Sequence, residues 1–283
     1  MVEPQRPRVL VVGAGKMGEA LVAGWLCART GPASGIDASC VTTVNRAVER
    51  RTYLAATYGV ATVAALAEAP QVDVVILAVK PQVMGNVLQG IDHMAPFQGG
   101  PCGPLFVSIA AGLSTERLAA MLPEAARIVR VMPNMPLMVG EGASGVCAGR
   151  EALPTDGTYV RDLFSCLGEA VLVDEDAMDA VCALSGSGPA YVAAFIEALA
   201  AAGAHAGLDA ALSERLAVRT VLGTARYLVE TGSSPAQTRE AICSPGGTTL
   251  AGLAALDRAG FSHAVDEGVA AAAARSKELG SSC

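Results

Sequence analysis

The chain has 283 residues and a formal net charge of −7, with 52% hydrophobic and 17% charged residues. This length is sufficient for two domains and for a core that needs neither disulfides nor a metal. A negative charge without a basic cluster argues against nucleic acid or an anionic membrane surface as a partner. An average soluble domain has about 25% charged residues, so the low share here indicates surface buried against another subunit, with an alanine-rich composition as the alternative.

Cysteine and histidine spacing points to a cytoplasmic protein without a metal site. The eight cysteines contain no CxxC or CxxH pair, which is typical of reduced thiols, and the three histidines lie far apart. The most apolar stretches, 190–204 and 268–274, are too short for a membrane span or include Glu197. We expect no signal peptide, because the first apolar run is brief and leads directly into a glycine motif.

The first half of the chain alternates between strand and helix patterns. Strands are predicted at 8–13, 41–45, 72–79, 105–111 and 126–132, with weaker candidates at 145–149 and 170–174. Continuous Val, Ile and Leu runs alternating with helical stretches predict an α/β fold with a parallel sheet covered on both faces. Ligands of such sheets bind beyond the carboxyl ends of the strands.

A glycine motif follows the first strand and opens the first helix. It reads Gly13-Ala14-Gly15-Lys16-Met17-Gly18, a complete GxGxxG in the strand–turn–helix context that dinucleotide binding requires. Gly13 permits the tight turn, Gly15 lets a pyrophosphate approach the backbone, and Gly18 lets the helix pack closely on the strand. The helix N-terminus adds unpaired N–H groups for the phosphates. A Rossmann-type domain is therefore predicted.

The end of the second predicted strand discriminates between the two nicotinamide cofactors. NAD-specific sites usually have an acid there, which binds the ribose hydroxyl. This chain has Asn45-Arg46 instead, and an arginine accepts the additional phosphate of NADP. NADPH is the favoured cofactor and NADH the alternative.

The second half of the chain is predicted to be helical. From about residue 175 the strand signals disappear and apolar residues recur at spacings of three and four, as between Leu212 and Leu228. Broadly apolar helices suit a domain that packs on another copy of itself. The predicted boundaries are 1–174 for the dinucleotide-binding domain and 175–283 for a helical substrate-binding and dimerisation domain.

Two glycine-rich stretches in the second half precede helical sequence. LSGSGPAY (184–191) is predicted to begin a helix with Ser187 as a cap and Pro189 in the first turn, and CSPGGTT (243–249) precedes another. Glycines at a helix start expose backbone N–H groups, which suits a small carboxylate-bearing substrate. Simple turns and caps are the alternative interpretation.

The motif series resembles that of the pyrroline-5-carboxylate reductases. The resemblance covers residues 8 to 279 and is carried, in order, by VVGAGKMGEALVAG, ILAVKPQ, VSIAAG, RVMPNMP, LSGSGPAY and SPGGTT. It implies a Rossmann domain followed by an all-helical dimerisation domain, assembled as a homodimer or a ring of dimers. It also implies reduction of L-1-pyrroline-5-carboxylate to L-proline, the last step of proline biosynthesis, with NADPH or NADH.

The resemblance also implies which residues contact the ligands. The expected cofactor contacts are Gly13, Ala14, Gly15, Lys16, Met17, Asn45, Arg46, Ala78, Val79, Lys80, Pro81, Ile109, Ala110 and Ala111. The expected substrate contacts are Glu175, Ser187, Gly188, Ser244, Gly246, Gly247, Thr248 and Thr249, with a contribution from the partner subunit.

Three positions depart from the family pattern. Met135 and Cys182 each stand where threonine is common, and Ala65 stands where many members have a cofactor-contacting asparagine. None removes a motif, but together they affect the expected rate and cofactor preference.

The predicted chemistry needs positioning and charge compensation rather than a nucleophile. A protonated cyclic imine is already electrophilic, which agrees with the absence of a Ser-His-Asp, Cys-His or metal pattern. Backbone N–H groups around 244–249 are expected to hold the carboxylate, and Thr249 to hydrogen-bond the ring nitrogen or the carboxylate. Glu175 is expected to offset the iminium charge, and Lys80 to act from the cofactor loop.

Three other functions are compatible with parts of this pattern. A 6-phosphogluconate-dehydrogenase type of 3-hydroxyacid dehydrogenase shares the two-domain plan, but the helix AYVAAFIEALAAAG lacks the lysine and asparagine those enzymes use. A reductase of another cyclic or acyclic imine stays open. A non-catalytic NADP-binding sensor is disfavoured, because it would not need both glycine stretches of the second half.

Overall fold

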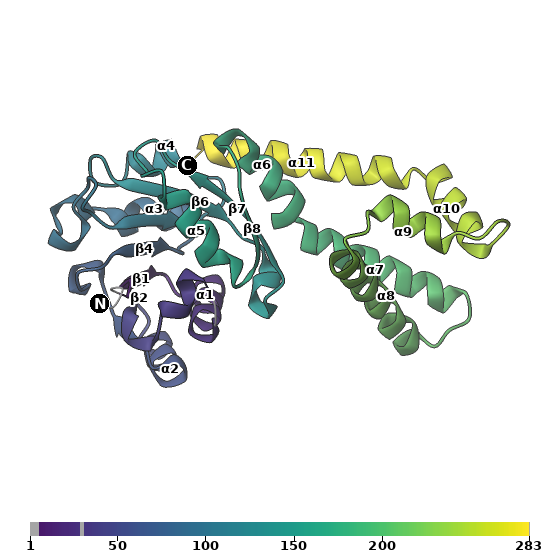
Figure 1. Cartoon of the computed structure of the whole chain (residues 1–283), viewed down its shortest axis with the longest axis horizontal. Coiled ribbons are helices and arrows are strands. Elements are labelled where there is room, and N and C mark those ends of the chain that lie inside the picture. The colour runs from purple at the N-terminus through teal and green to yellow at the C-terminus, as the bar shows by residue number, and fades with distance from the viewer. Residues whose placement is uncertain (1–5, 29–30, 283) are drawn as a thin grey trace. The chain divides into compact units, whose positions relative to one another are not determined.

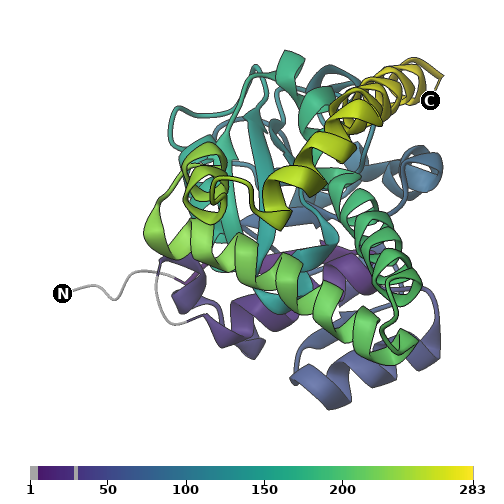
Figure 2. The ribbon, with the colours of Figure 1, turned by 90° about the vertical axis from the view of Figure 1, so that its right-hand side faces the viewer.

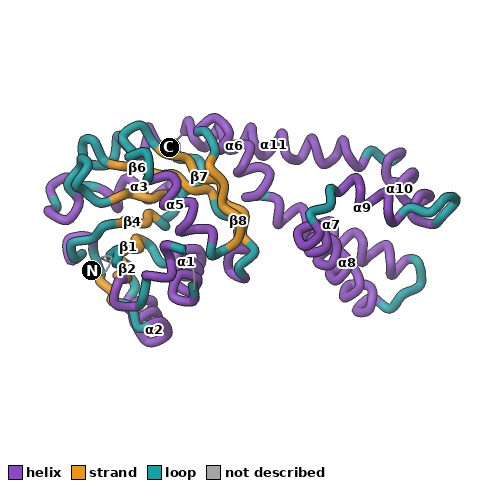
Figure 3. Tube along the Cα trace, viewed as in Figure 1, coloured by secondary structure: helices purple, strands orange, loops and turns teal. Residues whose placement is uncertain are grey.

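The computed structural model describes residues 6–28 and 31–282, which divide into two compact units (Figure 1). Unit 1 comprises the chain up to Ser187 together with the residues from Ala272 onward, and unit 2 comprises Gly188–Ala271. The strands all belong to unit 1, and unit 2 is helical (Figure 3). The predicted domain boundary at 174/175 lies 13 residues before this division.

Unit 1 is built on one sheet of eight described strands. They are β1 (Val9–Val12), β2 (Val41–Val44), β3 (Ala61–Val63), β4 (Val74–Leu77), β5 (Leu105–Ser108), β6 (Arg127–Met132), β7 (Gly142–Ala148) and β8 (Gly168–Leu172). Their order in the sheet is β3-β2-β1-β4-β5-β6-β7-β8. The first six follow the order of dinucleotide-binding α/β sheets, in which the strand order reverses beside β1. The α/β fold predicted from the sequence is confirmed.

Two features of the sheet differ from the sequence prediction. Strand β7 runs antiparallel to β6, whereas a parallel sheet was expected throughout. The connection between them contains only a short 3₁₀ helix, Met135–Val139, and a parallel return needs a crossover of about a dozen residues or more. Strand β3 was not predicted, because it has three residues and none of them is buried.

Helices cover both faces of the sheet. The α-helices of its layers are α1 (Lys16–Cys27), α2 (Val48–Tyr58), α3 (Pro81–Leu88), α4 (Thr115–Ala119) and α5 (Asp156–Ser165). Alternate residues of β1 belong to opposite cores, as the period of two requires: Val9 and Val11 pack with α1 and α5, and Leu10 and Val12 with α3 and α4. Short 3₁₀ helices at 32–35, 38–40, 66–68, 91–93, 95–97 and 175–177 complete the connections.

One helical stretch continues from Glu175 to His205. It consists of a 3₁₀ turn, α6 (Met178–Val181), a π-helical turn (Cys182–Gly186) and α7 (Gly188–His205). The helix α7 does begin inside LSGSGPAY, at Gly188, but it continues an earlier helical stretch. The prediction that Ser187 caps it is wrong, because the Ser187 N–H donates to the Cys182 carbonyl at 2.9 Å. By length and composition this stretch could cross a membrane, but one such helix is weak evidence for a membrane span.

Unit 2 contains α7, α8 (Ala210–Thr231), α9 (Pro235–Ile242), α10 (Thr248–Arg258) and the first part of α11 (Phe261–Ser282). Helices α7 and α8 form a hairpin (Figure 2). They approach closely at Gly203, where an added Cβ would lie 2.1 Å from Ser213 Oγ, and that hydroxyl donates to the Ala200 carbonyl at 2.6 Å.

Most large apolar side chains of unit 2 lie on its surface. They include Tyr191, Val192, Phe195, Leu199, Leu212, Leu216, Leu222, Tyr227, Val229, Ile242, Leu250, Leu256 and Val265. A patch of this size marks an interaction surface, which agrees with the expectation that the helical domain packs on a second copy.

Candidate active site: a glycine-loop cofactor cradle and its supports

The three glycines of the motif differ in the space that surrounds them. Gly13 has φ +86° and its added Cβ would lie 2.4 Å from a Val79 methyl group, so only glycine fits. An added Cβ on Gly18 would lie 3.0 Å from the Gly13 carbonyl oxygen, because α1 packs directly on β1. Beside Gly15 there is open space, since no described atom lies within 4 Å of an added Cβ. The loop thus leaves room for a pyrophosphate at the N-terminus of α1.

Two side chains from elsewhere in the sequence hold this loop in place. The Ala14 N–H donates to Asn45 Oδ1 at 3.3 Å, and Arg50 Nε donates to the Ala14 carbonyl at 2.8 Å. Arg50 also pairs with Glu19 at 2.5 Å. Burial raises the pKa of Glu19, but hydrogen bonds from Arg50 and two tyrosines outweigh it and leave that pKa below its usual value. Sequence reasoning missed Arg50, because no local pattern marks an arginine that reaches a loop 35 residues away.

A cavity of about 500 Å³ adjoins the glycine loop at the carboxyl ends of β1 and β2. Gly13, Asn45, Arg46 and Val79 line it, and so does Ala65, one of the departures from the family pattern. None of the described lining residues is acidic, and Arg46 supplies the positive charge. Arg46 is exposed, and its guanidinium has no acidic partner in the described part of the chain. The charge of the cavity lining therefore suits the additional phosphate of NADP.

The remaining predicted cofactor residues lie on the loops after β4 and β5. Ala78 and Val79 follow β4, exposed Lys80 precedes the first residue of α3, and Pro81 opens that helix. The stretch 109–111 follows β5, and the Ile109 N–H donates to the carbonyl of Leu77, the last residue of β4, at 3.1 Å. Lys16 and Met17 are the first residues of α1. The structure thus collects the predicted cofactor residues at one edge of the sheet.

Glu175 is part of a compact ionic cluster in unit 1. Its Oε1 accepts from Arg130 Nη1 at 2.5 Å, and its Oε2 accepts from the Thr115 hydroxyl at 2.7 Å and the Thr115 N–H at 3.1 Å. Arg130 lies in β6 with only 5% of its side chain exposed. Burial raises the pKa of Glu175, but Thr115 and Arg130 outweigh this and hold it below its usual value. The carboxylate is ionised, and its charge is already compensated.

Cys147 borders this cluster, with its Sγ 3.7 Å from Glu175 Oε2. Burial, together with the neighbouring Glu175 carboxylate, raises the pKa of this thiol to about 11. A thiol of this kind is protonated at neutral pH and is not a nucleophile.

The glycine-rich stretch 243–249 forms a tight turn before α10, and it belongs to unit 2. The Gly247 N–H donates to the Ser244 carbonyl at 3.0 Å, with Pro245 at the second position and Gly246, at φ +71°, at the third. This is the residue pattern of a type II turn. Thr248 and Thr249 are the first two residues of α10, where backbone N–H groups have no helical acceptor.

Ser187 and Gly188 lie where the π-helical turn passes into α7. No described atom lies within 4 Å of an added Cβ on Gly188, so the space beside it is open. Because the helix continues through this segment, it does not offer the row of free N–H groups that its predicted role as a helix start implied. The predicted substrate contacts of Ser187 and Gly188 stay predictions.

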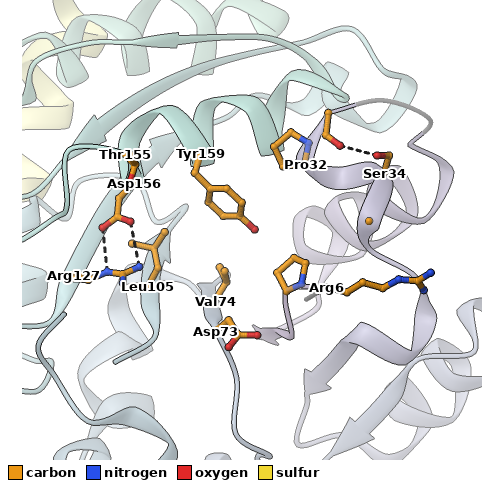
Figure 4. A pocket seen from close by; sticks show the side chains of 13 residues that line it. Arg6, Pro32, Ser34, Asp73, Val74, Leu105, Arg127, Thr155, Asp156 and Tyr159 are labelled. Atoms are coloured by element: carbon orange, nitrogen blue, oxygen red, sulfur yellow. Dashed lines mark hydrogen bonds and ion pairs between the residues drawn. The ribbon is translucent and has the colours of Figure 1, made fainter. Parts of the chain in front are cut away.

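A larger cavity, of about 1270 Å³, opens at the opposite edge of the sheet (Figure 4). Leu105 and Arg127 begin β5 and β6 there, and Arg127 pairs with Asp156 at 3.1 Å. None of the predicted site residues lines this cavity, and it lies at the amino ends of the strands. Ligands of such sheets bind at the carboxyl ends, so we do not assign this cavity to the reaction.

Family models assign the class of protein. Residues 8–125 match the model described as "NADP oxidoreductase coenzyme F420-dependent", and residues 175–279 match "Pyrroline-5-carboxylate reductase dimerisation". Together with the glycine-loop cradle, these matches define an NADP-dependent oxidoreductase with a separate dimerisation domain.

The particular family follows from near full-length similarity. A pyrroline-5-carboxylate reductase of Synechocystis sp. is 44% identical over 95% of this chain and 97% of its own length. Among solved structures, a pyrroline-5-carboxylate reductase from Coxiella burnetii matches with a TM-score of 0.88 at 31% identity, covering 97% of this chain and 99% of its own. The Plasmodium falciparum pyrroline carboxylate reductase with NADP bound matches with a TM-score of 0.81 at 32% identity, covering 97% and 98%. The chain belongs to the pyrroline-5-carboxylate reductase family.

Proposed function

We propose that this protein reduces L-1-pyrroline-5-carboxylate to L-proline, with NADPH as the preferred hydride donor and NADH as the alternative. Family membership over nearly the whole chain supports the reaction. The cavity beside the glycine loop carries the cofactor preference, since it presents Arg46 and no acid among its described lining residues. A 2′-phosphate is attracted by such a site, and an acid would repel it.

The substrate is proposed to bind through its carboxylate at the start of α10. Ser244, Gly246, Gly247 and Thr248 would hold the carboxylate, and Thr249 would hydrogen-bond the ring nitrogen or the carboxylate. When bound, the reduced cofactor would supply a hydride to the carbon of the protonated imine, whose C=N double bond becomes a C–N single bond while the nitrogen keeps its proton. The protein's contribution is to align the two ligands and exclude water.

Glu175 and Lys80 are proposed to support the site through charge and position and not to donate protons. The charge of Glu175 is compensated by Arg130, so it offsets the iminium charge less than the sequence alone implied. Its hydrogen bonds to Thr115 fasten the end of the loop that begins at Ile109. Lys80, exposed at the end of the β4 loop, would contact the cofactor phosphates or nicotinamide.

We also propose a cytoplasmic homo-oligomer, a dimer or a ring of dimers, in which a partner subunit completes the substrate site. The exposed apolar helices of unit 2 support the oligomer. The cysteines that the structure describes all have free thiols, as expected in a reducing compartment. Cys283 lies outside the described residues.

The test is the loss of nicotinamide absorbance when purified protein receives L-1-pyrroline-5-carboxylate, with NADPH and NADH in parallel. We expect faster oxidation of NADPH, with L-proline as the product. Oxidation only with other imines would move the assignment to a different imine reductase. Tight NADPH binding without oxidation by any imine would favour the sensor.

A further inference from the structure

A proline within the long helix leaves one of its carbonyl groups without a helical donor. In a regular α-helix the N–H of residue 189 would donate to the carbonyl of Ser185, but Pro189 has no N–H and its ring crowds that carbonyl. The helix responds with the π-helical turn Cys182–Gly186, in which the Ser187 N–H reaches back to Cys182. Such turns are frequent at functional sites.

Asn134 provides the missing donor. Its Nδ2 donates to the Ser185 carbonyl at 3.0 Å, and its Oδ1 accepts the Ala143 N–H at 2.9 Å. The residue is only 8% exposed, and both the nitrogen and the oxygen of its side-chain amide are hydrogen-bonded within the protein. This one side chain thereby connects the segment after β6, the start of β7 and the π-helical turn.

Close packing at Gly186 also indicates that the π-helical turn is attached to β6. An added Cβ on Gly186 would lie 2.6 Å from Met132 Cε, so the turn lies directly against the end of β6. That end neighbours the 109–111 loop, because β5 and β6 are paired up to Ser108 and Arg130. Ser187 and Gly188, two residues predicted to contact the substrate, follow the turn immediately.

We propose that Asn134 is a positioning residue of the reductase. Through the Ser185 carbonyl it fixes the π-helical turn on the carboxyl end of β6, and so sets where Ser187 and Gly188 lie when imine and nicotinamide meet. It acts through these residues and does not touch the reacting atoms. This inference rests on the proposed reaction and on the predicted place of Ser187 and Gly188 in the site.

The test uses Asn134→Asp in the full-length protein. The aspartate keeps the acceptor for the Ala143 N–H but places an oxygen against the Ser185 carbonyl. Gln98→Glu makes the same chemical change at an exposed position of unit 1 and is the matched control. The readouts are kcat and KM for L-1-pyrroline-5-carboxylate, Kd for NADPH, oligomeric state and Tm.

We expect kcat/KM for the imine to fall by at least about tenfold, since misplacement by about 1 Å is enough for such a loss. The Kd for NADPH should stay within about twofold of the wild-type value, because the Arg46 cavity is untouched. The control should match the wild type. A lower Tm with unchanged kcat and KM would overturn the proposal and leave Asn134 a purely structural residue.

If Asn134→Asp does not fold, Asn134→Ser, which is neutral and too short to reach Ser185, is measured in the same way. Failure of both variants to fold would also overturn the kinetic role, because the residue would then be needed for folding itself. Wild-type protein that does not reduce the imine would instead refute the proposed reaction. The two failures are therefore distinguishable.

Discussion

Gly15 and Gly18 are expected to be glycines for different reasons, one for cofactor binding and the other for packing. A Gly→Ala substitution at each position distinguishes the two reasons. The space beside Gly15 is open, and its φ of −73° is accessible to alanine. Gly15→Ala should leave Tm within about 2 °C of the wild type but raise the Kd for NADPH at least about tenfold, because the methyl group occupies the space of the pyrophosphate. Fluorescence titration and thermal denaturation measure the two effects.

Gly18→Ala is the companion variant and should show the opposite pattern. Its methyl group would meet the Gly13 carbonyl at 3.0 Å and two side chains at 3.3 Å, which costs about 1–3 kcal/mol of the free energy of unfolding. A stable Gly18→Ala protein, or tight NADPH binding by Gly15→Ala, would contradict these roles.

Arg46 is expected to determine the choice between NADPH and NADH. Arg46→Ala removes a charge-assisted contact with the 2′-phosphate, a contribution of about 1.5–3 kcal/mol. The KM for NADPH should therefore rise about 10- to 100-fold, and the KM for NADH should change by less than about threefold. Arg150→Ala, at an arginine with 95% of its side chain exposed, is the control. Equal effects on both cofactors would mean that Arg46 does not bind the phosphate.

The Glu175 carboxylate should stabilise the fold at neutral pH and not in acid. Its pKa is lower in the folded protein than in the unfolded chain, so its contribution is complete at neutral pH and is lost as the pH falls through the lowered pKa of the folded state. Glu175→Gln leaves the buried Arg130 without a counter-charge, which costs about 3 kcal/mol at pH 7. The difference in Tm from the wild type should then shrink towards pH 3.

Asp176→Asn, one residue further along and exposed, is the control for this experiment. A Tm difference between Glu175→Gln and the wild type that is the same at pH 3 and pH 7 would show that the ionised form of Glu175 does not carry the contribution.

At the scale of elements, the contact of α7 with α8 can be measured as a coupling free energy between substitutions at Gly203 and Ser213. In a helix interior Gly→Ala gains about 1 kcal/mol, but at Gly203 the new Cβ would displace the Ser213 hydroxyl from the Ala200 carbonyl. Gly203→Ala should therefore be close to neutral in the wild type and stabilise the Ser213→Ala variant by about 1 kcal/mol. A double-mutant cycle in urea measures this difference, and exact additivity would exclude the contact.

The elements that the sequence predicts best are those whose signal is local. Buried Val, Ile and Leu runs such as VLVV in β1 and VVIL in β4 fall where they were expected, and so does the glycine loop between β1 and α1. The π-helical turn was missed, because it depends on Pro189 and on the amide of Asn134, 51 residues from Ser185. The contacts of Arg130 and Thr115 with Glu175 were not predicted for the same reason, since they join residues 45 and 60 positions apart in the sequence.

At the scale of the whole molecule, the two units differ in how they bury apolar surface. Unit 1 encloses large side chains such as Trp25 and Phe106 completely on the two faces of its sheet. In unit 2 the buried residues, Ser213, Ala217 and Thr238, are all small. Small buried side chains supply little hydrophobic free energy, so we expect unit 2 to gain stability from a partner surface. Folding of the helical domain and assembly are then expected to be linked.

A charge in the exposed apolar surface of α8 should break this assembly. Leu222, 48% exposed in the single chain, lies two helical turns from Val229, which is 83% exposed. Leu222→Glu would place a carboxylate in the subunit interface, where an unpaired charge costs several kcal/mol. Light scattering after size exclusion should show dissociation towards the monomer, with a lower Tm. Imine reduction should also be lost, since we propose that the partner subunit completes the substrate site. Leu153→Glu, at a leucine 37% exposed in unit 1, should stay assembled and active. An active, fully assembled Leu222→Glu protein would show that this face of α8 is not the interface.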